Sequence, residues 1–177
     1  ILFAPDYRTG IPYQEYLSRE LQALGLQVDF LSDYRRILPL ARGVKEPAPD
    51  ILHLHWPEKY FPAGSRAAAR KIRYSLDLAL AIRGRRLFLT AHNLLPHNRH
   101  EEWGVAYNVR KTAQKSAGIF VHSQFALEEV VRNFGVSPSQ CFLIPYGDHT
   151  DGWEPPLPRM QARAELNVPE GDAVCLV

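Results

Sequence analysis

The sequence lacks the features that mark membrane, secreted and nucleic-acid-binding proteins. No apolar run reaches the roughly 18 to 20 residues that a membrane-spanning helix needs, and the first residues do not have the pattern of a signal peptide. The two cysteines, Cys141 and Cys175, have neither metal-binding nor redox spacing, so we expect buried free thiols in a reducing compartment. A net charge of +2 is too small to favour a nucleic-acid partner. These absences favour a cytoplasmic protein, with the inner face of the cell membrane as an alternative place.

Several nucleotide-binding and catalytic motifs are also missing. The first apolar run is followed by a single glycine, Gly10, rather than by the Gly-x-Gly-x-x-Gly pattern of dinucleotide-binding turns. The sequence has no P-loop, no Gly-x-Ser-x-Gly elbow and no Asp-x-Asp pair of the kind that holds a metal-bound nucleotide sugar. We therefore expect neither a dinucleotide cofactor nor a metal ion.

What the sequence does contain is an alternation of short apolar runs with helical patterns. The apolar runs lie at 1–4, 27–31, 50–57, 87–91, 118–122 and 141–147, and the helical patterns at 12–24, 65–83, 99–117 and 124–134. Continuous apolar runs between helices are typical of parallel strands that are covered on both faces. The pattern predicts an α/β fold, a Rossmann-like doubly wound parallel sheet.

The end of the chain differs in character. Trp153 to Pro158 is rich in proline, Arg159 to Leu166 has a helical composition, and Ala173 to Val177 is an apolar run with no partner strand after it. We expect residues 1–153 to form one Rossmann-like domain. Residues 154–177 are expected to be an interdomain linker and the first strand of a second domain that this chain does not contain.

Polar and aromatic side chains follow the predicted strands. Because parallel strands bring their carboxyl ends to one edge of a sheet, we expect these side chains to converge there. Hydrogen-bonding groups beside a flat apolar wall suit a polyhydroxylated ligand such as a sugar. His92 has the strongest functional interpretation, because a neutral imidazole at this edge can move a proton near physiological pH. The other candidates for substrate binding are Asp6, Gly10, His55, Trp56, Glu58, Asn93, Ser123, Tyr146 and Gly147.

Several of these residues also have a structural interpretation. Asp6 can stabilise the turn after the first strand, and Ser123 can cap the helix that follows it. His53 and His55 share one face of a strand, where a satisfied structural histidine is commoner than a metal ligand. Trp56 can be a core residue at the edge of the sheet.

Two further groups of residues are expected to be mainly structural. Tyr13 and Tyr16 of the first predicted helix are interpreted as packing residues rather than binding residues. A basic run is usually a solvated helix face, and contact with a membrane surface is the alternative interpretation. This run comprises Arg66, Arg70, Lys71, Arg73, Arg83, Arg85 and Arg86.

Four segments in order resemble landmarks of one enzyme family. They are "DILHLHWPE" (50–58), "LTAHNLLPH" (89–97), "GIFVHSQFALEEV" (118–130) and "LIPYGDHTDGW" (143–153), preceded by a helix ending in "LQALGLQV". Together they are similar to family-four retaining glycosyltransferases of the GT-B fold, above all to bacterial members that build exopolysaccharides or lipid-linked glycans. The resemblance covers nearly the whole chain.

The resemblance implies that the chain is the N-terminal, acceptor-side domain of a metal-independent enzyme. A C-terminal domain would then hold the nucleotide-sugar donor, and this chain alone would be inactive. By position, His92 matches the histidine that faces the reacting sugar, Gly10 the loop near the donor phosphates, and Ser123 the serine that opens the helix after strand five. Many relatives have two adjacent glycines where this chain has Thr9-Gly10, which puts the backbone contact of that loop with the donor in question.

Two other functions remain open from the sequence. A nucleotide-sugar 2-epimerase has the same two-domain build, and it would form product without any acceptor. A non-catalytic α/β module that binds a carbohydrate or a protein is the alternative from another class.

Overall fold

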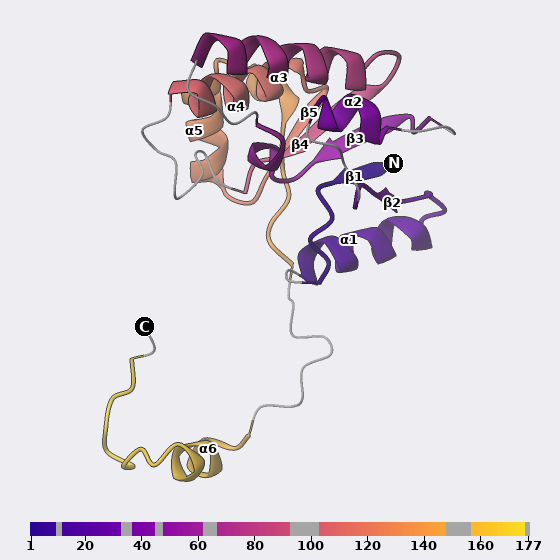
Figure 1. Ribbon diagram of the computed structural model, residues 1–177. Coiled ribbons are helices and arrows are strands. Elements are labelled where there is room, and N and C mark those ends of the chain that lie inside the picture. Colours follow the sequence, from indigo (N-terminus) through magenta and orange to yellow (C-terminus); the bar gives the residue numbers. More distant parts are fainter. Residues whose placement is uncertain are drawn as a thin grey trace. The chain divides into compact units, whose positions relative to one another are not determined.

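The computed structural model describes residues 1–9, 12–32, 37–44, 48–61, 67–92, 103–147 and 157–175. The chain divides into two compact units, Ile1–Gly147 and Asp148–Val177 (Figure 1). Two of the predicted site residues, Gly10 and Asn93, lie outside the described residues.

The first unit contains a six-stranded parallel sheet. Its strands stand in the order β2-β1-β3-β4-β5-β6, so the predicted α/β Rossmann-like fold is confirmed. Every neighbouring pair is parallel, and the carboxyl ends of all strands therefore lie at the same edge of the sheet. The strands are β1 (Leu2–Ala4), β2 (Asp29–Phe30), β3 (Ile51–Leu54), β4 (Arg86–Thr90), β5 (Gly118–Val121) and β6 (Cys141–Leu143).

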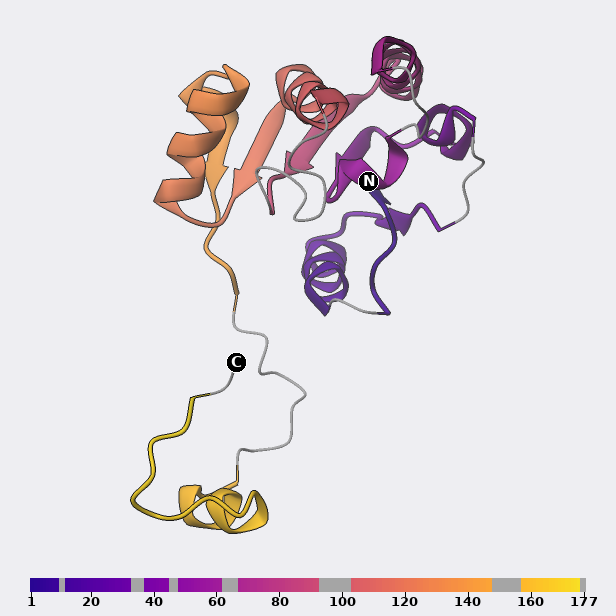
Figure 2. The same ribbon diagram turned by 60° about the vertical axis from the view of Figure 1, so that its left-hand side comes forward.

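Helices flank the sheet on both faces (Figures 1 and 2). The chain passes from β1 to β2 in one direction and from β3 to β6 in the other, and right-handed crossovers then place the connecting helices on opposite faces. Accordingly, α1 (Pro12–Ala23) lies on one face. The other face carries α2 (Pro39–Gly43), α3 (Ala67–Ala81), α4 (Trp103–Lys115) and α5 (Gln124–Phe134).

The hydrophobic core lies between the sheet and the helices α2 to α5. Leu52 and Leu54 of β3, Leu87 and Leu89 of β4, and the matching residues of β5 are buried in it. Alternation along each strand sends the intervening side chains to the face of α1. That second face is aromatic rather than aliphatic: Phe3 contacts His53, and His53 contacts Phe120.

The predicted helix ends agree with the structure at two glycines and one serine. Gly25 follows α1 with a φ of +83°, and Gly135 ends α5 with a φ of +64°, a backbone region that glycine adopts without a Cβ clash. Ser123 caps α5, since its Oγ accepts a hydrogen bond from the backbone N–H of Ala126 at 3.1 Å.

The short helix α2 was not predicted from the sequence. Its first N–H groups, at Leu40 and Ala41, donate to the carboxylate of Asp77 on α3 at 3.1 and 2.8 Å. Burial raises the pKa of Asp77, and these backbone donors oppose that rise. The cap comes from a distant helix, so no local sequence signal marks it.

The second unit contains α6 (Arg159–Glu165), which confirms the predicted helix there. The strand predicted from Ala173 is not formed at residues 173–175, which lie outside any strand. A strand needs a neighbour for its backbone hydrogen bonds, and none of the described strands pairs with this segment. Cys175 is exposed and Cys141 half-buried, so the expectation of two buried thiols is wrong.

Membrane-spanning helices are absent from the part of the chain that the structure describes: none there combines the length and the apolar composition that crossing a bilayer requires.

Candidate functional site

His92 lies just beyond the carboxyl end of β4, and its ring is stacked on the indole of Trp56. The ring centroids are 4.2 Å apart and the planes are 7° from parallel. Trp56 follows β3, and the pairing of β3 with β4 brings these two strand ends together. The prediction that residues after different strands converge is thus met for this pair.

Two buried histidines of the β3 segment lie beneath His92. Nδ1 of His55 is 3.4 Å from Nε2 of His92, and the ring of His55 is stacked on that of His53 with centroids 4.3 Å apart. His53 in turn is hydrogen-bonded to the hydroxyl of Thr90 at 2.8 Å, as a satisfied structural histidine would be. His55 is only 1% exposed, a position suited to holding His92 rather than to touching a ligand.

Three further rings complete the group around His92. Tyr13 of α1 lies 5.0 Å from His92, and His122, just after β5, lies 5.3 Å from it, centroid to centroid. Tyr146 contacts both Tyr13 at 5.2 Å and His122 at 4.5 Å. We refer to Tyr13, His55, Trp56, His92, His122 and Tyr146 as the ring cluster.

Burial keeps two histidines of the ring cluster, His92 and His55, uncharged at neutral pH. It lowers the pKa of His92 to about 3, with repulsion from His122 as a smaller cause. Burial also lowers the pKa of His55 well below its ordinary value, and the neighbouring His53, His92 and His122 add to this. Both imidazoles are therefore neutral near pH 7, and each offers one N–H donor and one nitrogen acceptor.

The two tyrosines of the ring cluster are held in the protonated form. Burial raises the pKa of Tyr13 to about 12, although a hydrogen bond with Thr90 works against the rise. Burial raises the pKa of Tyr146 as well. At His122, Nδ1 lies 2.9 Å from the carbonyl oxygen of Ile144, which can only accept, so Nδ1 carries a proton. Neutral donors and acceptors beside flat rings are the groups that bind sugar hydroxyls and the apolar face of a sugar.

A second feature of the same sheet edge is an open pocket of about 380 Å³ at the ends of β1 and β2. Oδ1 of Asp6 accepts hydrogen bonds from the backbone N–H and the Nε–H of Arg8 at 3.2 and 3.0 Å, and Oδ2 accepts from Nη2 at 2.9 Å. These hydrogen bonds from Arg8, chiefly those of its side chain, lower the pKa of Asp6. The Arg8 guanidinium also lies 3.9 Å from the ring centroid of Phe30. The remaining lining residues are Thr9, Glu15 and Ser32.

Two observations bear on the interpretations of Asp6. It stabilises the turn after β1, as the structural interpretation predicted, and it also lines a pocket. In that pocket a bidentate ion pair with Asp6 and a ring contact with Phe30 orient the guanidinium of Arg8.

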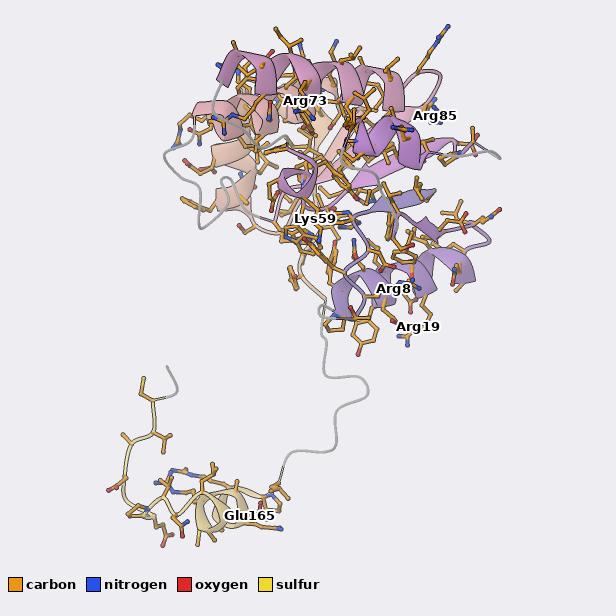
Figure 3. The ribbon with its side chains drawn as sticks, viewed as in Figure 1. Arg8, Arg19, Lys59, Arg73, Arg85 and Glu165 are labelled. Atoms are coloured by element: carbon orange, nitrogen blue, oxygen red, sulfur yellow. The ribbon has the colours of Figure 1, made fainter. Side chains whose placement is uncertain are left out.

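The other predicted residues lie around the ring cluster without joining it. Glu58 belongs to the 3-10 helix η1 (Pro57–Tyr60) and, with His55 and Trp56, lines a cavity of about 20 Å³. In the same helix, Lys59 (labelled in Figure 3) lies over the ring of Tyr7, with Nζ 4.8 Å from the ring centroid. The Tyr7 ring also contacts Trp56. Ser123 is exposed and acts as a helix cap, and Gly147 is exposed beside Tyr146.

Two members of the ring cluster were missed by sequence reasoning. Tyr13 was interpreted as a packing residue, and His122 was treated as part of a strand. His122 could have been found from the sequence. It follows β5 as His92 follows β4, and both side chains lie on the same face of the sheet. Tyr13 carries no such signal, since its place depends on how α1 crosses the edge of the sheet.

A metal site would need a group of at least three His, Cys, Asp or Glu side chains. The described ranges contain no such group.

Comparison with known proteins identifies the family. A family model described as Glycosyltransferase Family 4 matches residues 2–151, which cover the sheet, the ring cluster and the Asp6–Arg8 pocket. No curated protein matches the chain. The match extends over more than half of the chain and agrees with the Rossmann-like fold. The chain belongs to glycosyltransferase family 4.

Proposed function

We propose that this chain is the acceptor-side domain of a metal-independent, retaining glycosyltransferase. The enzyme moves a sugar from a nucleotide-sugar donor to a glycan or a lipid-linked acceptor, in the synthesis of exopolysaccharide or cell-envelope glycan. A second domain, outside this chain, would hold the nucleotide, and the chain alone would be inactive. The observation that carries the proposal is the stacked pair of His92 and Trp56 at the edge of a family-four domain.

The chemistry assigned to His92 follows from its burial. In the transfer, the bond between C1 of the sugar and the phosphate oxygen breaks, and a bond between C1 and the acceptor oxygen forms. The acceptor hydroxyl must lose a proton, and the leaving phosphate can take it. With a pKa of about 3, His92 is a poor base at pH 7. We therefore assign His92 the role of positioning and hydrogen-bonding the reacting sugar, against the wall formed by Trp56.

The pocket of Asp6 and Arg8 is proposed to bind the acceptor. Arg8 is already neutralised by Asp6, and Glu15 adds a further negative charge, so the lining has a net charge of −1. Such a lining favours uncharged sugar hydroxyls over a phosphate or a uronate. Arg8 still has unused N–H donors, and the carboxylates have unused acceptor positions, which is the mixture that vicinal hydroxyls need.

The proposal places the enzyme in the cytoplasm, where nucleotide sugars are made. For a lipid-linked acceptor it also includes a peripheral contact with the inner face of the cell membrane, because the acceptor sugar would be presented there.

The proposed function is tested with protein expressed from the complete gene. It is incubated with UDP-glucose, UDP-galactose, UDP-N-acetylglucosamine and GDP-mannose, with bacterial membranes or oligosaccharides as acceptors, in buffer containing EDTA. We expect release of nucleoside diphosphate that depends on the acceptor and persists in EDTA, and a product with the donor's anomeric configuration. A sugar nucleotide converted to its epimer without an acceptor would contradict the proposal, and so would a protein that binds no nucleotide sugar.

A further inference from the structure

The outer surface of α3 carries a row of exposed apolar side chains. Ile72, Leu76 and Leu80 are 69%, 51% and 42% exposed, and a spacing of four residues places them along one side of the helix. The opposite side, with Tyr74 and Leu78, is already buried in the core. A surface helix normally has polar residues on its outer side, so this row is an unpartnered apolar surface. α3 lies at the outer side of the helical layer in both ribbon views (Figures 1 and 2).

The surroundings of this row are basic. The described parts of α2, α3 and α4 contain one acidic residue, Asp77, and it is buried with its carboxylate on the N–H groups of α2. The turn after α3 adds Arg83 and Arg85, and β4 begins with Arg86; Arg83 and Arg86 are exposed. The basic residues of the three helices are Arg42, Arg70, Lys71, Arg73, Arg110, Lys111 and Lys115.

Individual basic side chains are placed to frame the row. Arg73 lies next to Ile72 in the helix and is exposed (Figure 3). Lys71, on the other side of Ile72, reaches over the ring of Tyr107 on α4 with its Nζ 4.9 Å from the ring centroid. Long basic side chains beside an apolar row can keep their charges in a headgroup layer while the row enters the acyl boundary.

We propose that α3 is a membrane-contact surface that lies in the interface of an anionic lipid bilayer. Ile72, Leu76 and Leu80 would enter the boundary between headgroups and acyl chains, and the surrounding arginines and lysines would contact lipid phosphates. The charge decides between occupants: a second copy of this chain would bring the same basic surface, and the two would repel, whereas an anionic bilayer neutralises it. The proposal needs neither a donor nor catalysis, so it can be tested apart from the proposed function.

The test is sedimentation of the 177-residue chain with vesicles. Vesicles of 30% phosphatidylglycerol in phosphatidylcholine are compared with pure phosphatidylcholine at low and high salt. We expect binding to the anionic vesicles alone, with a partition constant that falls at least roughly tenfold when the salt concentration is raised from low to about 0.5 M. The triple variant I72Q/L76Q/L80Q is expected to lose at least roughly tenfold in that constant, because glutamine keeps the helix but not the apolar row.

A matched control removes equally exposed apolar residues elsewhere. Leu24, Leu26 and Ile37 are 78%, 44% and 60% exposed and lie outside α3, so L24Q/L26Q/I37Q should bind like the wild type. R73Q/R83Q/R86Q, which leaves the apolar row intact, should also weaken binding and should flatten the salt dependence. Far-ultraviolet circular dichroism confirms that each variant is folded.

Three results would overturn the proposal. One is a wild-type chain that does not bind anionic vesicles at low salt. A second is a control variant that loses as much binding as the α3 variant. The third is a wild-type dimer, detected by sedimentation velocity, that the α3 variant converts to a monomer while vesicle binding is unchanged.

Discussion

The imidazole of His92 lies flat on the indole of Trp56, with 4.2 Å between ring centroids and 7° between planes. The two residues come from neighbouring strands, and the indole contributes to the burial that keeps the imidazole neutral. Removing the indole should therefore change the titration of His92 and not only the packing.

We predict that Trp56→Ala raises the pKa of His92 from about 3 toward the ordinary value of 6.5, because water gains access to the imidazole. It should also destabilise the domain by roughly 2 to 3 kcal/mol through loss of ring contacts. The pKa is measured by NMR titration of the histidine ring protons, assigned by comparison with His92→Phe. Trp56→Phe keeps a ring in place and should leave the pKa low. An unchanged pKa in Trp56→Ala would show that the indole does not control the environment of His92.

Stability should fall as the pH is lowered below neutrality. His53 and His92 have folded-state pKa values of about 3, against 6.5 in an unfolded chain, so between these pH values the unfolded chain binds protons that the folded chain does not. The folded state therefore carries no penalty from these two histidines above about pH 6.5. The free energy of unfolding decreases as the pH falls from there toward 3. Each of these histidines contributes at most about 1.4 kcal/mol per pH unit in that window.

The variant His92→Phe isolates one of these contributions. It keeps a flat ring on Trp56 but cannot be protonated, so the slope of unfolding free energy against pH should decrease by up to about 1.4 kcal/mol per pH unit. Urea unfolding at pH 7, 6 and 5 measures both slopes. Equal slopes in the two proteins would mean that His92 is not kept neutral by the fold.

The loop that leads from β1 to α1 should depend on one buried glutamine. Gln14 donates from Nε2 to the carbonyl oxygen of Pro5 at 2.8 Å and accepts at Oε1 from the backbone N–H of Tyr7 at 2.7 Å. Gln14→Leu leaves both backbone groups without this partner, and should destabilise the domain by about 2 to 4 kcal/mol. Gln22→Leu changes an exposed glutamine of the same helix, and should cost less than about 0.5 kcal/mol. If thermal unfolding showed the same loss of stability in Gln14→Leu and Gln22→Leu, this role of Gln14 would be refuted.

The acceptor role of the Asp6–Arg8 pocket predicts a specific kinetic effect. Asp6→Asn weakens the ion pair that orients Arg8, so the KM for the acceptor should rise roughly tenfold while the KM for the nucleotide sugar stays within about twofold. Asp29→Asn, an exposed carboxylate on β2, is the matched control. A rise in the donor KM instead would assign this pocket to the donor.

The fold was predictable from the sequence because most strands lie in short, mainly apolar runs. Leu87 to Ala91 and Gly118 to His122 contain enough local information to place β4 and β5 within one residue at each end. The strand from Cys141 was predicted to continue to Gly147 but ends at Leu143, because Leu143 pairs with Val121, the last residue of its neighbour β5.

The site was predictable only in part, because the rule of converging strand ends gives the position of a residue but not its burial. It located His92 and Trp56 correctly, yet it treated His55 as a ligand-binding residue although the rings of Phe3 and Tyr13 pack against it. Tyr13 belongs to the ring cluster because of the way α1 packs against the sheet, and no sequence motif marks that packing.

The central claim is that His92 faces the transferred sugar, and turnover of the enzyme expressed from the complete gene tests it most directly. The rate of nucleoside diphosphate release is compared between the wild type, His92→Ala and the control variant Gln22→Ala on the exposed side of α1. We predict a loss of at least roughly a hundredfold in kcat for His92→Ala, with little change in the control. Normal turnover by a folded His92→Ala enzyme would contradict the account.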